Sequence, residues 1–270
     1  MKKILIACCI ASVFTVSTAN AQQKEGRVVY ERTFQLQIRF TGMDEGVERS
    51  LPRTRTDKIE VLFGNNHSLR KPIIDDTPDE TSFDAGNGMQ IRTFTAGADD
   101  ITFINLGEGT MVEQRELGTK KYLVTDSIRK LNWKLTGEAK TILGYPCQQA
   151  IAQRISSRMM MTMDNGQMKR EEVPDTTNIT AWFAPSIPVS AGPEYQGQLP
   201  GLILAVDINN GRTVIKALEV SPKVDVASIK EPKGGKKITQ AEFTKERDKM
   251  FEEMQKNSGG GNRRTIRIGG

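Results

Sequence analysis

The second half of the chain contains a cluster of methionines whose spacing suits a soft metal ion. Residues 159–163 read MMMTM, and Met168 follows after five positions. Thioether sulfurs bind Cu(I) well, and they stay available as ligands in an oxidising compartment where thiols are lost. In an extended strand Met159, Met161 and Met163 lie on one face, because side chains alternate. We therefore predict a Cu(I) site at these three residues; the alternative is a methionine-rich hairpin end without metal.

Residues that commonly serve catalysis are scarce in this sequence. His67 is the one histidine, and Cys147 is the one cysteine beyond the first nine residues. Zinc sites built from several His ligands or from a thiolate cluster are thereby excluded. The chain also lacks a Gly-x-Ser-x-Gly motif, a phosphate-binding loop and a dinucleotide fingerprint. We therefore expect that the protein is not an enzyme and that it binds no cofactor besides the copper considered above. Cys147 is expected to be a buried small hydrophobic residue, and a Cys147–His67 nucleophile pair is the alternative.

The N-terminal residues have the layout of a secretory signal peptide. Two lysines are followed by an apolar stretch over residues 4–16, which is too short to span a bilayer core of roughly 30 Å. An Ala-Asn-Ala sequence then ends at Ala21 and fits the pattern that signal peptidase cleaves. We predict a signal peptide over residues 1–21, a mature chain that begins at Gln22, and a location in the periplasm or outer cell envelope. The alternative is a lipoprotein, because Leu-Ile-Ala-Cys ends at Cys8, but the apolar stretch before that cysteine is short.

Apolar and polar residues alternate over much of the chain, which is the pattern of half-buried strands. In residues 28–40 one face is nearly all apolar and the other mostly polar. Asn209-Asn210-Gly211 predicts a tight hairpin turn, because Asn and Gly accept positive φ. Further strands are predicted at 59–63, 90–95, 101–106, 112–117, 121–125, 134–136, 142–145, 148–156, 168–173, 179–184, 202–208 and 213–220. The expected fold is mainly β (a β-rich α+β fold): a large curved antiparallel sheet or half-barrel with one C-terminal helix.

That helix is predicted over residues 239–257. Thr239 and Glu242 have the spacing of a capping box, in which each side chain bonds the backbone N–H of the other residue. A run of glycines follows, and residues 258–270 are expected to form a disordered basic tail that could touch a membrane surface. No nucleic-acid partner is expected, because an exported protein rarely meets nucleic acid. The remaining residues, 22–257, are expected to form a single domain.

Several segments in the middle of the chain have a recognisable order and spacing. They are YLVTDS at 122–127, WKLTGE at 133–138, ILGYPCQQA at 142–150, AWFA at 181–184 and LPGLIL at 199–204. The sequence resembles the GLPGLI family, also described as the Porph_ging domain, over roughly residues 27–255. The resemblance implies an envelope protein of Gram-negative bacteria, and it implies no particular activity, since none is established for the family.

We interpret the LPGLIL segment as a turn that leads into a central strand, and not as a binding loop. Pro200 suits the second position of a turn and Gly201 the third, where a type II turn needs positive φ. Residues 202–204 are expected to be buried in a strand that pairs with 213–220. The chain has Gln198 where the family name begins with Gly, so the turn is either strained at this position or rearranged.

These features favour an exported, non-enzymatic binding or accessory protein of the cell envelope. By analogy with periplasmic lipoprotein carriers, a curved sheet of this kind would hold its partner on the inner face. The partner would be an envelope protein, a peptide or an apolar ligand. The alternative is a periplasmic Cu(I)-handling protein that uses the cluster at residues 159–168, and the second alternative is an enzyme of unrecognised chemistry.

Overall fold

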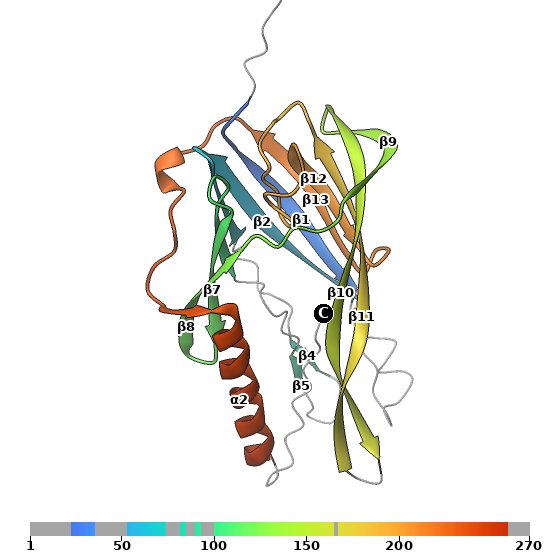
Figure 1. Cartoon of the computed structure of the whole chain (residues 1–270), viewed down its shortest axis with the longest axis vertical. Helices are drawn as coiled ribbons and strands as arrows, with labels where there is room; N and C mark the ends of the chain where they lie inside the picture. Colours follow the sequence, from blue (N-terminus) through green and yellow to red (C-terminus); the bar gives the residue numbers. More distant parts are fainter. Residues whose placement is uncertain are drawn as a thin grey trace, which may run out of the picture.

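Most of the chain folds into strands that join one large sheet (Figure 1). The computed structural model describes residues 23–35, 53–73, 82–84, 90–92, 100–164 and 167–258. Twelve of the described strands form an open sheet in the order β14-β8-β7-β6-β3-β2-β1-β13-β12-β11-β10-β9, and β4 and β5 form a separate pair. The strands are β1 (Gly26–Gln35), β2 (Thr54–Gly64), β3 (His67–Ile73), β4 (Ser82–Asp84), β5 (Gln90–Arg92), β6 (Ile101–Asn105), β7 (Thr110–Leu117), β8 (Lys120–Ser127), β9 (Lys134–Ile142), β10 (Tyr145–Asp164), β11 (Gln167–Ala184), β12 (Leu202–Ile208), β13 (Thr213–Ser221) and β14 (Lys236–Thr239).

The predicted fold class is confirmed, with one correction to the pairing. Neighbouring strands of the large sheet are antiparallel, except that β14 pairs in parallel with β8. β14 was not predicted, because its four residues are too few to show a period. The sheet does not close into a barrel, and a single α-helix, α2 (Gln240–Ser258), follows it in the described part of the chain. A short 3₁₀ turn, η1 (Val226–Ser228), was also missed.

The main core lies between the sheet and the loop of residues 185–201 that joins β11 to β12. Val28, Tyr30 and Phe63 from the centre of the sheet are fully buried there. Ile187 and Leu199 from the loop pack into the same cluster. We call this side of the sheet the inner face. The loop therefore fills a concave surface that would otherwise expose a broad apolar area to water.

The turn before β12 has the predicted place but not the predicted geometry. Residues 202–204 are fully buried, and β12 pairs with β13 across the Asn209-Asn210-Gly211 turn, as expected. Gly201, however, does not adopt positive φ. Positive φ falls earlier, at Tyr195 (55°) and Gly197 (75°), so the loop is rearranged and Gln198 is free of that strain.

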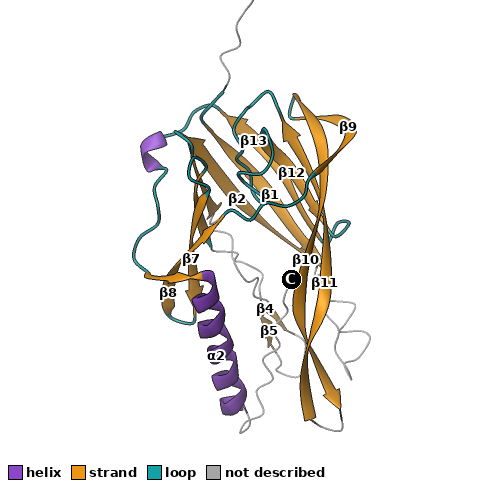
Figure 2. Cartoon of the chain, in the orientation of Figure 1, coloured by secondary structure: helices purple, strands orange, loops and turns teal. Residues whose placement is uncertain are grey.

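Helix α2 begins with the predicted capping box. The Glu242 N–H donates to Thr239 Oγ1 at 3.3 Å, and the Thr239 N–H donates to Glu242 Oε2 at 2.7 Å. Phe243 packs edge-on against Tyr122 of β8, with ring centroids 5.6 Å apart. The rest of the helix extends past the sheet, at the same end of the molecule as the β10–β11 hairpin (Figure 2).

Four regions named in the sequence predictions lie wholly or partly outside the described residues. They are the signal peptide at 1–21, the basic tail at 258–270, the end of the first predicted strand at 36–40 and the end of the predicted strand 90–95 at 93–95. Within the described part of the chain, no helix combines the length and the apolar character that crossing a membrane requires.

Candidate functional site

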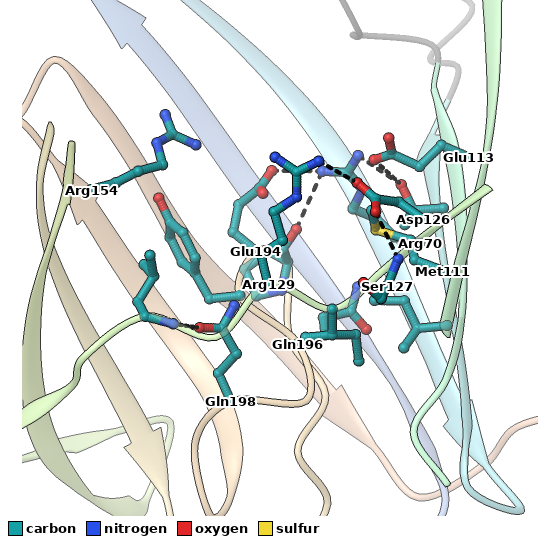
Figure 3. Close-up of a pocket in the computed structure, with 16 residues that line it drawn as sticks. Arg70, Met111, Glu113, Asp126, Ser127, Arg129, Arg154, Glu194, Gln196 and Gln198 are labelled. Atoms are coloured by element: carbon teal, nitrogen blue, oxygen red, sulfur yellow. Dashed lines mark hydrogen bonds and ion pairs between the residues drawn. The ribbon is translucent and has the colours of Figure 1, made fainter. Parts of the chain in front are cut away.

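A cleft of about 270 Å³ opens on the inner face, beside the 185–201 loop (Figure 3). One wall comes from β3, β6, β7 and β8, and the opposite wall includes β10. Five strands separate β3 from β10 in the sheet, so the sheet must curve strongly to bring both walls to one cleft. The lining residues are Arg70, Thr102, Ile104, Met111, Glu113, Asp126, Ser127, Ile128, Arg129, Leu131, Arg154, Pro193, Glu194, Tyr195, Gln196 and Gln198.

Arg70 fixes the loop to the first wall. Its guanidinium is buried, and Nη1 donates to Glu194 Oε1 at 2.6 Å and to the Pro193 carbonyl at 3.3 Å. Nη2 of the same side chain donates to Thr102 Oγ1 at 2.9 Å. Beside it, the Ser68 hydroxyl donates to Oε1 of buried Gln196. The bonds to Glu194, Pro193 and Gln196 hold the loop against the first wall, and the bond to the Glu194 carboxylate is charge-assisted.

The hydrogen bonds continue from the cleft towards helix α2. Thr102 Oγ1 donates to Glu113 Oε1 at 3.5 Å, and Glu113 forms an ion pair with Arg115. The guanidinium of Arg115 donates to Gln240 Oε1 at 3.3 Å and lies 5.3 Å from the ring centroid of Phe243. The first wall of the cleft is therefore tied to the first turn of the helix.

Tyr195, in the 185–201 loop, has an uncommon backbone conformation. Its φ of 55° lies in the left-handed region, which costs a bulky residue free energy unless its surroundings hold it. The Trp133 ring packs edge-on against the Tyr195 ring at 5.5 Å. Gln198 Oε1 accepts hydrogen bonds from the Leu131 N–H at 2.9 Å and from Trp133 Nε1 at 3.0 Å. Gln198 thus anchors the loop to residues 131–133, which explains why glutamine is accommodated here.

The phenol of Tyr195 is a stable hydrogen-bond donor. Burial raises the pKa of Tyr195 to about 12; the Glu194 carboxylate adds to the rise, and the charge of Arg154 opposes it. The hydroxyl therefore stays protonated over the range in which proteins work.

The charged groups of the cleft are almost all paired. Arg70 pairs with Glu194, Arg129 pairs with Asp126 at 2.9 Å, and Glu113 pairs with Arg115. Arg154 is the exception: among the described residues no carboxylate lies within 4 Å of it. Figure 3 shows its side chain apart from the other labelled charges, on the opposite side of the cleft from Glu113.

The predicted copper ligands lie elsewhere, on the long β10–β11 hairpin. Met159, Met161 and Met163 belong to β10, where the register pairs Met163 with Met168 of β11. Their side chains lie outside the described part of the structure, so the copper site stays a prediction.

Cys147 and His67 do not come together. Cys147 is buried in the main core on the inner face, as predicted, and burial raises the pKa of its thiol. His67 stacks on Phe103 at 5.3 Å, on the outer face of the sheet. A nucleophile pair of these two residues is therefore excluded. Among the described residues, no group of three or more His, Cys, Asp or Glu side chains could hold a metal ion.

Comparison with known proteins finds one family model that matches part of the chain. Residues 133–205 match a family model described as a protein of unknown function (Porph_ging), which confirms the resemblance to that domain. The match runs from Trp133 through β12 and includes Arg154, Tyr195 and Gln198 of the cleft. A search of curated proteins found no match.

Solved structures of PNGF-II, in two crystal forms, are similar to the chain at a low level. One is 17% identical with a TM-score of 0.48, and it covers 84% of this chain and 34% of the PNGF-II chain. The other is 16% identical with a TM-score of 0.49 and covers 83% and 33%, respectively. This chain therefore spans about a third of the length of PNGF-II.

Proposed function

We propose that the protein is exported to the cell envelope and acts there as a non-enzymatic binding protein, which holds a peptide segment in the cleft of the inner face. The observation that carries this proposal is the composition of the cleft. Guanidinium, carboxylate, hydroxyl and amide groups alternate with apolar side chains around one small space. Such a mixture matches the backbone amides and mixed side chains of a peptide.

An apolar ligand fits the site less well. A fatty acyl chain needs a long cavity lined by apolar side chains, whereas in the described part of the chain Ile187 and Leu199 of the loop pack against the apolar inner face. This cleft is small, and six of its sixteen lining residues are charged. A short exposed segment of an envelope protein suits a small cleft with charged walls, since one or two of its side chains can enter a space of about 270 Å³.

The state of the cleft carboxylates also favours binding over catalysis. A general acid or base must be available to exchange a proton with the substrate. Glu194, Asp126 and Glu113 each form an ion pair with an arginine instead. These pairs shape and rigidify the walls, which is what selective binding requires.

A Cu(I)-handling function is the second candidate. It is favoured by the register of the β10–β11 hairpin, which sets Met163 directly opposite Met168 at the end of the methionine cluster. Its test is given in the Discussion.

Tryptophan fluorescence can test peptide binding, because one of the two tryptophans is next to the cleft. Trp133 contacts Tyr195, whereas Trp182 lies under Lys140, with Nζ 4.0 Å from the ring centroid. In the processed protein carrying Trp182→Phe, pools of synthetic hexapeptides should change the emission of Trp133 in a saturable way.

The matched control carries Trp133→Phe and keeps Trp182, and its emission should not respond. Palmitate serves as the apolar probe in the same assay. A saturable response to palmitate with none to any peptide pool would replace the peptide by an apolar ligand. No response to either probe would refute a binding role for this cleft.

A further inference from the structure

The charge balance of the cleft leaves one cation without a counterion. Three ion pairs account for Arg70, Arg129 and the three lining carboxylates, with Arg115 supplying the third guanidinium. Arg154 remains; it is exposed, lines the cleft and carries a single positive charge. A guanidinium presents paired N–H donors that match the two oxygens of a carboxylate.

Tyr195 adds an uncharged hydrogen-bond donor to the part of the cleft that Arg154 lines. We call the part of the cleft lined by Arg154 and Tyr195 the corner. The charge of Arg154 lies close enough to influence the phenol, and both side chains line the cleft. Among the described residues the Tyr195 hydroxyl has no hydrogen-bond partner, although the ring itself is held by Trp133. The strained φ of 55° at Tyr195 is the kind of conformation that persists where a ligand group has to be met.

We infer that Arg154 and Tyr195 form a subsite for one carboxylate group of the bound peptide, an inference that rests on the proposed binding function. The carboxylate would accept two N–H bonds from the guanidinium and one O–H bond from the phenol. Its single negative charge balances the single unpaired positive charge. A phosphate monoester carries a charge of about −1.5 to −2 near neutral pH and would leave the corner negative. The carboxylate belongs either to an Asp or Glu side chain or to a chain terminus.

Three peptide pools separate these sources in the Trp133 assay. In the first, each peptide has one acidic side chain and an amidated end; in the second, each is neutral with a free terminal carboxylate; the third is neutral and amidated. At least one of the first two pools should bind at least tenfold more tightly than the third, because a hydrogen-bonded ion contributes roughly 1.5–3 kcal/mol, which is about 10- to 100-fold. Whichever pool shows the preference identifies the source.

Variants of the corner supply the controls. Arg154→Gln should abolish the preference for the carboxylate pool, and Tyr195→Phe should reduce it by roughly two- to tenfold. Arg247→Gln is the matched control, because Arg247 is an exposed arginine of helix α2 that does not line the cleft. It should leave the preference unchanged. Pools that bind equally well, or an Arg154→Gln variant that keeps the preference, would overturn the subsite and leave the binding function intact.

A second measurement does not depend on peptides. In NMR spectra, the Nε–Hε signal of Arg154 can be assigned by its loss in Arg154→Gln. When the protein is titrated with succinate this signal should shift in a saturable way, whereas chloride at equal ionic strength should not shift it. If inorganic phosphate gave a saturable shift larger than that with succinate, the inference that the subsite binds a carboxylate would be wrong. An unmoved signal would overturn the subsite even if peptides bind, whereas a succinate shift without any peptide binding would refute only the peptide function.

Discussion

Gly201 lies where the 185–201 loop passes the end of β11, and the space beside it admits no side chain. A Cβ at this position would lie 2.5 Å from the Ala184 carbonyl oxygen, which is a backbone atom and cannot move aside cheaply. We expect Gly201→Val to lower the free energy of unfolding by about 1–3 kcal/mol, as overpacking does. Urea denaturation measures the loss.

The control for this variant is Gly107→Ala, whose new methyl group would lie no closer than 3.4 Å to any neighbour outside the adjoining residues. It should change stability by less than about 0.5 kcal/mol. If Gly201→Val unfolds at the same urea concentration as the parent, the loop can shift to make room for the side chain. The short distance between residue 201 and the Ala184 carbonyl oxygen would then not contribute to stability.

Leu204 tests whether the strand after the turn is core. Its side chain is fully buried between the sheet and the loop. Leu204→Ala should cost about 2–5 kcal/mol in urea denaturation, because it removes buried methyl groups and leaves a cavity. Leu135→Ala is the matched comparison, since Leu135 is 57% exposed on β9, and it should cost far less. Equal effects of the two substitutions would contradict the assignment of Leu204 to the core.

At the scale of residues, short-range patterns were predictable and long-range contacts were not. Residues 202–204 were correctly assigned to a buried strand, because an apolar run next to a turn is a local signal. The need for glycine at 201 was recognised but explained wrongly, since its cause is Ala184, a residue from a different strand. Arg154 and Tyr195 were missed for the same reason: each is unremarkable in its own segment, and only the folded sheet brings them together.

At the scale of elements, the β10–β11 hairpin extends beyond the rest of the sheet. β9 pairs with β10 up to Ile151, and β12 pairs with β11 from Ile179 onwards, so the outer part of the hairpin is a two-stranded ribbon. The methionine cluster belongs to this ribbon, and leucine keeps the approximate size and the apolar character of methionine. Replacement of Met159, Met161 and Met163 by Leu should therefore change stability by less than about 1.5 kcal/mol.

The same triple variant tests the copper prediction. If these thioethers bind Cu(I), the affinity measured by competition with a chromogenic chelator should collapse, because leucine has no sulfur ligand. Met250→Leu, which removes a methionine sulfur from helix α2, should leave the affinity unchanged. A parent protein that binds no Cu(I), or a triple variant with undiminished affinity, would end the copper assignment.

Helix α2 provides a prediction about pH. Hydrogen bonds from the Thr239 N–H and hydroxyl lower the pKa of Glu242 from its ordinary value of 4.5. Its charged form therefore stabilises the folded state above pH 4.5, and this contribution is lost as the pH falls through the lower pKa of the folded protein. The melting temperature of the parent should exceed that of Glu242→Gln at neutral pH, and the difference should shrink towards zero in acid.

Glu253 supplies the comparison for this measurement, because it is exposed in the same helix but lies beyond the first turn. Glu253→Gln should not reproduce the pH-dependent difference. A gap between the parent and Glu242→Gln that is constant from neutral pH into acid would show that the glutamate acts through packing and not through its charge.

The element predictions failed where strands were very long or very short, and they also missed the seven-residue β3 (His67–Ile73), whose mixed sequence shows no alternation. The sequence suggested separate strands at 168–173 and 179–184, interrupted near Pro174, yet β11 runs continuously through both. Proline is tolerated there because no third strand among the described residues pairs with the ribbon at that position, so β11 is an edge in this part of the structure. β14 shows the opposite case, since its short parallel pairing with β8 depends on a neighbour more than a hundred residues away in the sequence.

At the scale of the whole molecule, the curvature of the sheet determines where binding could occur. Twist and coiling accumulate over twelve strands until β10 faces the wall formed by β3, β6, β7 and β8. The sequence predicted a curved sheet but not the closeness of those two walls, because curvature sums many small strand-to-strand rotations. The cleft is thus a property of the complete sheet and not of one motif.

The last prediction concerns export, and the position of β1 makes it compatible with the fold. β1 begins at Gly26 and lies between β2 and β13 in the sheet, so cleavage after Ala21 removes no residue of any described strand. Mass spectrometry of the protein purified from its native envelope should give a chain that starts at Gln22, or at its cyclised form. Substitution of Ala21 by a bulky residue such as Leu should leave the longer precursor, because signal peptidase requires a small residue before the cut. A chain that instead begins with a diacylated Cys8 would make the protein a lipoprotein, anchored to the membrane by its lipid.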